Sequence, residues 1–130
     1  SRLADQLIKE NKVEKAKQAL DKAFEVMPEE NVPYDYFVMF LAENYYAIGE
    51  FEKGNEIVRR LADIYERDLN YYMSLKPEFA KTVRSEMDQS RGILNRLIVM
   101  TNQLYPQKEF GKEMNDRLSP YFGSVNQQNR

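Results

Sequence analysis

The chain contains neither cysteine nor histidine among its 130 residues, and these two absences exclude a wide range of chemistry. Thiolate and imidazole groups supply zinc and iron–sulfur ligands, cysteine nucleophiles and the bases of histidine-dependent triads. The sequence therefore offers no site of these kinds. The lack of cysteine leaves the compartment open, because a chain without thiols is stable in oxidising and in reducing surroundings.

Long apolar runs are also missing, and none approaches the roughly 18 residues that a membrane-spanning helix needs. No secretory leader is visible. The net charge of −2 argues against a dedicated nucleic-acid binder. The charge is uneven, with 10 basic and 15 acidic residues up to Leu75 and 9 basic and 6 acidic residues from Lys76 onward. Such a split is either ordinary solvated surface or the mark of a docking face.

Motifs that hold phosphate, dinucleotides or calcium are absent from the sequence. The acidic pair Glu29 and Glu30 falls in an expected loop, and Asp63, Glu66 and Asp68 fall on an expected solvated helix face. Paired carboxylates need a cleft to act as acid and base, and nothing in the sequence predicts one. We therefore expect no catalytic residue, no cofactor and no metal site in this chain.

Apolar residues recur at helical spacing along the whole chain, and no strand pattern is present. The pattern predicts an all-α fold of six helices in three antiparallel hairpins, at about 1–28, 34–73 and 77–122, with a polar tail over 123–130. We expect one domain over 1–122. The expected core includes Leu3, Leu7, Ile8, Phe37, Phe40, Tyr45, Tyr65, Phe79 and Met87.

Turns and prolines mark the expected helix boundaries. Asn11-Lys12 is expected to form the first turn, and Gly49 to end the third helix. The segment Pro28–Pro33 reads as a loop. A fifth helix of close to thirty residues is expected from Pro77 to just before Pro106, with Gly92 as a weak point.

The chain nearly repeats itself once. The stretch from Leu3 to Leu20 aligns with the stretch from Leu41 to Val58, 38 residues later, and Ala16 meets Gly54 in this alignment. A period of this size is typical of stacked helical hairpins. The second unit, with Leu41-Ala42, Tyr45 and Gly54, resembles the tetratricopeptide pattern, in which small residues let two helices of a hairpin approach closely.

Two features depart from that pattern. The repeat is 38 residues long, and Glu66 stands where the final proline of the second unit would fall, so that helix is expected to run on. The third hairpin does not match the pattern. We interpret it as a capping pair that covers the apolar end of the stack. A plain helical bundle with coincidental similarity is the alternative.

A partner-binding surface is expected on the first helix of each hairpin, because these helices line the concave face of a stacked-hairpin scaffold. Aromatic side chains there give a large contact area at low entropic cost. The opposing interpretation is that the third hairpin folds over these residues and buries them. The candidate partner-binding residues are Asp5, Ile8, Tyr36, Met39, Glu43 and Tyr46.

The pair Tyr71-Tyr72 lies near the end of the fourth expected helix. An aromatic pair at this place either anchors a membrane interface or a neighbouring domain, or it plugs the helix end against the fifth helix. The sequence favours the plug.

Two segments of the sequence resemble a known protein family, and they are Asn31–Phe37 and Asp68–Leu75. The chain resembles the C-terminal tetratricopeptide-like region of large bacterial multi-pass membrane proteins, whose N-terminal part is similar to protein O-mannosyltransferases. The resemblance covers Leu3 to about Leu75 and extends more loosely to Phe122. It implies a parent that transfers a sugar from a lipid-linked donor to proteins, with the catalytic acid in a membrane part that is not in this sequence. The helical start at Ser1 favours a fragment of such a longer protein.

We therefore expect a non-catalytic helical scaffold that contacts a protein or peptide segment, or its own membrane domain. The resemblance implies a location on the periplasmic face of the cytoplasmic membrane. The alternative is a free-standing soluble adaptor or oligomerisation module, which would be cytoplasmic. Neither hypothesis involves a nucleic acid.

Overall fold

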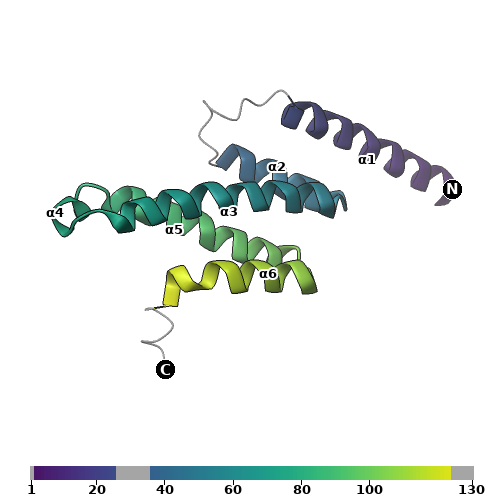
Figure 1. Cartoon of the computed structure of the whole chain (residues 1–130). Coiled ribbons are helices and arrows are strands. Elements are labelled where there is room, and N and C mark those ends of the chain that lie inside the picture. Colours follow the sequence, from purple (N-terminus) through teal and green to yellow (C-terminus); the bar gives the residue numbers. More distant parts are fainter. Residues whose placement is uncertain (1, 26–35, 124–130) are drawn as a thin grey trace. The chain divides into compact units, whose positions relative to one another are not determined.

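The computed structural model describes residues 2–25 and 36–123, and these residues are helical with no strand (Figure 1). The all-α prediction is confirmed for them. The elements are α1 (Arg2–Glu25), α2 (Tyr36–Ala47), α3 (Phe51–Ser74), α4 (Pro77–Ala80), α5 (Arg84–Val99), the π-helical η1 (Met100–Leu104), α6 (Lys108–Leu118) and the 3-10 turn η2 (Ser119–Phe122). The expected loop at Pro28–Pro33 and the tail beyond Gly123 lie outside the described residues.

The chain divides into two compact units, an N-terminal unit over Ser1–Ile57 and a C-terminal unit over Val58–Arg130. The first half of the N-terminal unit is the uninterrupted helix α1. The turn expected at Asn11-Lys12 is therefore wrong, and the first expected hairpin is a single helix. The reason is local: neither residue is glycine or proline, and both are tolerated inside a helix at a cost well under 1 kcal/mol.

Because α1 is continuous, its two halves cannot bury each other. None of its described residues is buried, and the expected core residues Leu3, Leu7 and Ile8 are more than half exposed. Two polar contacts hold α1 to its own unit. The hydroxyl of Tyr45 in α2 donates to Asp21 over 2.7 Å, and Lys17 lies 3.5 Å from Glu50.

Helix α2 ends at Gly49, as the sequence predicts. Gly49 has a φ of +85°, a left-handed conformation that glycine adopts without steric cost. Its N–H donates to the carbonyl of Tyr46 over 3.0 Å, and the N–H of Glu50 donates to the carbonyl of Tyr45 over 2.9 Å. This pair of bonds is a Schellman motif, which satisfies the last carbonyls of α2 and reverses the chain into α3.

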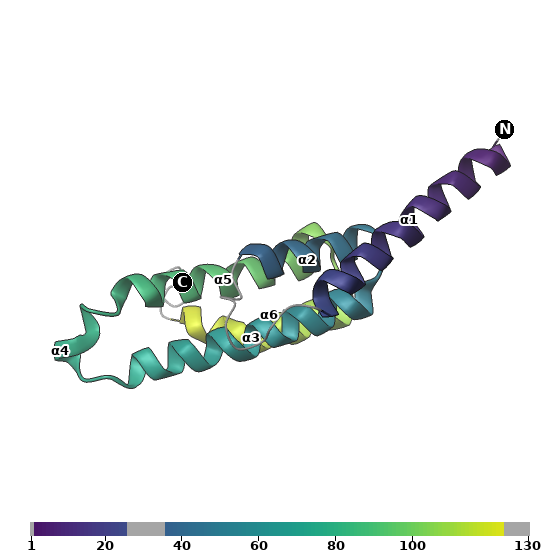
Figure 2. The same cartoon turned by 90° about the horizontal axis from the view of Figure 1, so that it is seen from above.

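The C-terminal unit is built from the later part of α3 with α5, η1 and α6 (Figures 1 and 2). Each of these helices contributes a stripe of buried apolar side chains at helical spacing. The buried residues are Val58, Leu61, Ala62, Tyr65 and Leu69 of α3, Ile93, Leu94 and Leu97 of α5, Met100 of η1, and Phe110, Met114 and Leu118 of α6. Tyr45 in the N-terminal unit and Tyr65 are buried, as expected, and α3 runs on past Glu66 to Ser74.

The long fifth helix of the sequence prediction is interrupted. It begins at Pro77 as expected, but α4 lasts one turn, and α5 starts only at Arg84. The break falls at Thr82 and Val83, two β-branched residues that fit poorly in a helix. Gly92, the expected weak point, lies inside α5 without interrupting it.

The end of this helical segment is confirmed. η1 stops before Pro106, and the N–H of Tyr105 donates to the carbonyl of Met100 over 2.9 Å, which closes a π-helical turn. Helix α6 then approaches η1 closely at Gly111. A Cβ at this position would lie 2.8 Å from the carbonyl oxygen of Thr101. The amide of Asn102 donates to the carbonyl of Gly111 over 3.0 Å and fixes this approach.

Candidate functional site

The expected partner surface is not available as a whole, because two of its residues are in the core. Met39 is 6% exposed and Tyr46 is 2% exposed. The ring of Tyr46 lies directly over Gly54, its hydroxyl donates to Asn55 over 2.7 Å, and its centroid is 5.6 Å from that of Phe51. All these contacts lie inside the N-terminal unit. The hairpin of α2 and α3 therefore contributes to the burial of Tyr46.

The other expected partner residues have different surroundings. Asp5 and Ile8 of α1 are exposed, and Glu43 of α2 is partly exposed. The side chain of Tyr36 lies outside the described part of the structure. Since Met39 and Tyr46 are core residues, the six residues do not form one exposed surface.

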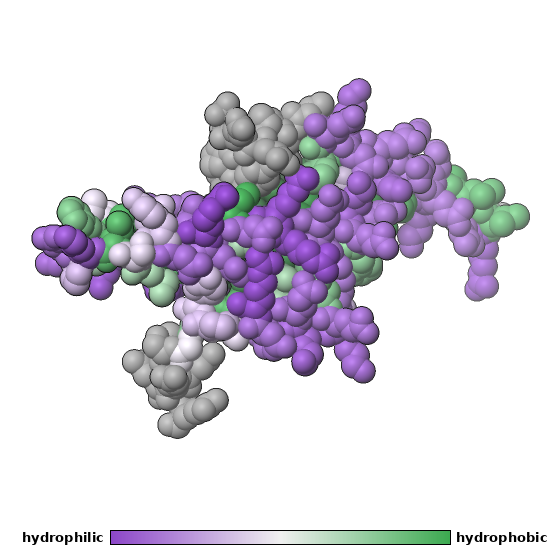
Figure 3. All heavy atoms as spheres, in the orientation of Figure 1, coloured by the Kyte–Doolittle hydropathy of each residue, from purple (hydrophilic) through white to green (hydrophobic). Residues whose placement is uncertain are grey.

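A different set of apolar residues is exposed in the N-terminal unit. Phe37 and Phe40 of α2, which the sequence placed in the core, are 52% and 58% exposed. Figure 3 shows hydrophobic side chains at the N-terminal end of α1, where the exposed Leu3, Leu7 and Ile8 lie. The sequence could not find Phe37 and Phe40, because the run from Tyr36 to Ala42 is apolar throughout and does not show which face is buried.

Tyr45 is the titratable group whose environment is most altered. It is fully buried, and its hydroxyl donates to Asp21. Burial raises the pKa of Tyr45 well above its usual value, and the hydrogen bond to Asp21 and the charges of Asp21, Glu50 and Glu56 raise it further. A phenol held neutral in this way is a structural hydrogen-bond donor.

The acidic residues on α3 have a structural partner that sequence reasoning missed. Arg117 of α6 donates to Glu66 over 2.7 Å and also to Asp63. Burial lowers the pKa of Arg117, but the hydrogen bonds with Asp63 and Glu66 and their charges raise it overall. Nearby, Arg59 pairs with Glu113 at 3.2 Å and lies 4.7 Å from the ring centroid of Phe110. These carboxylates join α3 to α6 and have no arrangement for acid–base catalysis.

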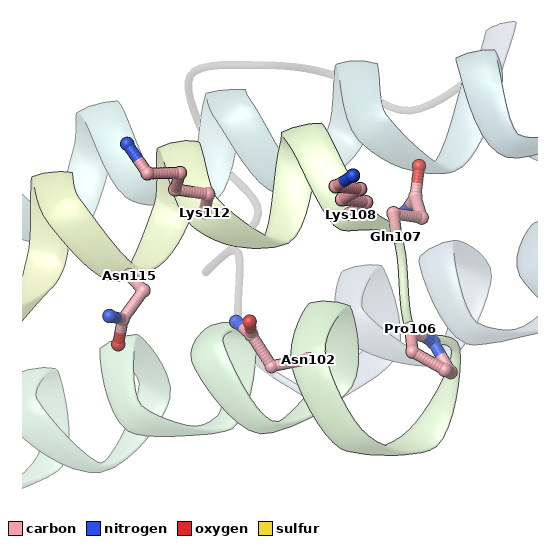
Figure 4. Close-up of a pocket in the computed structure, with 6 residues that line it drawn as sticks. All are labelled: Asn102, Pro106, Gln107, Lys108, Lys112 and Asn115. Atoms are coloured by element: carbon pink, nitrogen blue, oxygen red, sulfur yellow. The ribbon is translucent and has the colours of Figure 1, made fainter.

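A polar depression lies between η1 and α6 in the C-terminal unit (Figure 4). Its lining residues include Lys108, Lys112, Asn102 and Asn115. Lys112 is engaged with Asp116 at 3.4 Å, and the amide of Asn102 donates to backbone carbonyls of Ile98 and Gly111. Lys112 and Asn102 are thus engaged in structural contacts, and the depression defines no reaction.

The described residues include no group of three or more acidic side chains placed to hold a metal ion. No described helix has the length and apolar character that crossing a membrane requires. Comparison with known proteins adds no relative, since neither a family model, nor a curated protein, nor a solved structure matches the chain.

Proposed function

We propose that this chain is a non-catalytic helical scaffold that makes protein–protein or interdomain contacts through the N-terminal unit. The observation that carries the proposal is that five large apolar side chains among the described residues of that unit are more than half exposed. They are Leu3, Leu7, Ile8, Phe37 and Phe40. The proposed surface includes the exposed candidates Asp5 and Ile8. It does not include Met39 and Tyr46, which are buried.

The tetratricopeptide-like character belongs to this proposal and rests on one hairpin. Helices α2 and α3 are joined by a tight turn at Gly49, and Gly54 provides the small residue over which Tyr46 packs. The first repeat unit shares the sequence pattern but not the turn. The scaffold we propose therefore has one hairpin of this kind beside a single long helix.

Site-specific photo-crosslinking in the source cells tests the contact surface. A photoreactive residue in place of Leu7 or Phe40 is expected to give a defined adduct, because both side chains are exposed and apolar. The same residue in place of Glu14, which is exposed on α1, is the matched control. Equal adducts from all three positions, or none from Leu7 and Phe40, would contradict the proposal.

We further propose that the scaffold is part of a membrane protein similar to O-mannosyltransferases, on the periplasmic face of the cytoplasmic membrane. The residues Asn31–Phe37 and Asp68–Leu75 support this, through the family they resemble. An antibody blot after alkaline washing of membranes tests it. A band far larger than 15.4 kDa that stays with the membranes is the expected result. A band near 15.4 kDa in the wash would favour the alternative, a free-standing cytoplasmic adaptor or oligomerisation module.

A further inference from the structure

The end of α3 and the helix α4 carry large apolar side chains that the C-terminal unit does not bury. Tyr71 is 61% exposed, Met73 54% and Phe79 51%. Figures 1 and 2 show α4 at the turn between α3 and α5, at one end of this unit, and Figure 3 shows hydrophobic side chains at that end. Phe79 belonged to the expected core of a long fifth helix, and the interruption of that helix leaves it exposed.

The two neighbouring tyrosines have separate surroundings. Tyr72 is partly buried, and burial together with the charges of Asp68 and Glu86 raises its pKa. Tyr71 meets Tyr72 edge-on, with ring centroids 5.8 Å apart, and is otherwise exposed. Tyr71 is therefore the more exposed member of the pair.

Basic residues lie close to these apolar ones in the sequence. Lys76, Lys81 and Arg84 are exposed, and within the described part of the chain none of them has an ion pair. The stretch from Tyr71 to Arg84 contains a single acidic residue, Glu78, and Asp68 and Glu86 are the next acidic residues on either side. We call the exposed set Tyr71, Met73, Phe79, Lys76, Lys81 and Arg84 the aromatic tip.

We propose that the aromatic tip docks on an anionic membrane surface, with Tyr71, Met73 and Phe79 entering the headgroup region and the three cations facing lipid phosphates. Tyrosine suits this place because its ring is apolar and its hydroxyl is polar. Lysine and arginine place their stems in the interface and their charges among the headgroups.

The expected binding is weak and needs both parts of the tip. One small apolar anchor gives only marginal membrane affinity, and a basic cluster adds the second signal. Each cation near an anionic surface contributes about a five-fold gain in affinity, so three contribute on the order of a hundred-fold. The proposal concerns the C-terminal unit and does not depend on the partner surface of the N-terminal unit.

The chain has no tryptophan, which allows a direct test with a single reporter. The variant Phe79→Trp is mixed with vesicles of phosphatidylglycerol and phosphatidylcholine in equal parts. We expect its emission to shift to the blue and to be quenched by brominated acyl chains. The control is Leu104→Trp, in η1 of the same unit at a residue that is 46% exposed, and it should show neither effect. Circular dichroism confirms that both variants are folded.

Charge is tested in the Phe79→Trp background. Changing Lys76, Lys81 and Arg84 to Gln should lower the vesicle partition coefficient on the order of a hundred-fold. The matched control changes the exposed Arg67, Lys108 and Lys112 of the same unit to Gln, with a loss of less than about ten-fold because these residues lie outside the tip.

Several results would overturn the proposal. One is an unchanged Phe79→Trp spectrum with anionic vesicles, and another is an equal loss in the two charge variants. Equal binding to pure phosphatidylcholine would remove the role of the cations. A blue shift that grows with protein concentration in the absence of vesicles would mean that the tip joins two copies of this chain.

Discussion

The ring of Tyr46 in α2 lies against Gly54 in α3 so closely that a Cβ on Gly54 would be 2.6 Å from Cδ1 and 2.9 Å from Cζ of the tyrosine. Tyr46 has little room to move, because it is buried and its hydroxyl is bonded to Asn55. This contact fixes the spacing of the hairpin in the N-terminal unit. It also removes Tyr46 from the surface where the sequence placed it.

Replacing Gly54 by alanine should therefore destabilise the chain. Overpacking costs about 1–3 kcal/mol, which exceeds the gain of up to about 1 kcal/mol from the better helix propensity of alanine. The control is Gly92→Ala in α5, where no atom lies within 4 Å of the added Cβ. That variant should be stabilised by about 0.5–1 kcal/mol. Urea unfolding of both variants measures the difference, and a stabilised Gly54→Ala chain would refute the packing argument.

The close approach of α6 to η1 predicts a second sensitive glycine. In Gly111→Ala the new Cβ would meet the carbonyl oxygen of Thr101 at 2.8 Å and Oδ1 of Asn102 at 2.9 Å. A backbone carbonyl moves less easily than the end of a side chain, so we expect a loss of about 1–3 kcal/mol of unfolding free energy. Thermal unfolding monitored by circular dichroism measures it. A melting temperature equal to that of the parent chain would show that η1 moves to accommodate the added Cβ without loss of stability.

Tyr45 predicts a dependence of stability on alkaline pH. Its pKa is raised in the folded state above the ordinary 10.0, so the folded chain holds this proton more tightly than the unfolded chain. The stabilisation is fully present below pH 10.0 and is lost as pH rises above it. Tyr45→Phe should cost about 0.5–1.5 kcal/mol at neutral pH through the lost hydrogen bond. The free energy of unfolding of this variant should also fall less steeply with rising alkaline pH than that of the parent chain.

Urea unfolding of Tyr45→Phe across this pH range provides the measurement. The exposed Tyr71→Phe is the control and should follow the parent chain. Parallel curves for Tyr45→Phe and the parent would show that Tyr45 does not contribute to the alkaline loss.

The ion pairs between α3 and α6 should differ in strength. Glu66 is 19% and Arg117 29% exposed at the side chain, whereas both members of the Arg59–Glu113 pair are close to half exposed. Solvent screens the second pair more strongly. A double-mutant cycle on Glu66 and Arg117 should give a coupling of about 1–2 kcal/mol, against less than about 1 kcal/mol for Arg59 and Glu113. The reverse order of the two couplings would contradict this ranking.

Much of the helical arrangement can be read from the sequence where glycine or proline marks a boundary. Gly49, Pro77 and Pro106 all stand where the structure changes direction. Asn11 occupies the place of Gly49 one repeat earlier, but asparagine adopts positive φ less readily than glycine, and the helix continues through it. Similarity between the two repeat units therefore predicted a turn that the local chemistry does not support.

The candidate surface was harder to predict, because exposure depends on which helices pack together. Tyr46 and Phe40 are both large aromatic residues on α2, yet one is buried and the other exposed. Gly54 alone does not reveal the difference, because Gly92 also lies inside a helix and has no atom within 4 Å of an added Cβ. The pairing of Arg117 with Glu66 joins residues 51 positions apart, and no local pattern predicts it.

Helix α1 has no buried residue, and its polar anchors, Lys17 and Asp21, lie in its second half. Its first half is therefore held by little more than its own backbone hydrogen bonds, and an isolated helix shorter than about 12 residues is marginal in water. Amide hydrogens over 2–12 should exchange with solvent by local fraying, far faster than those of the buried segment 38–46. In hydrogen-exchange terms, this half of α1 is the part of the chain whose protection a bound partner would increase most.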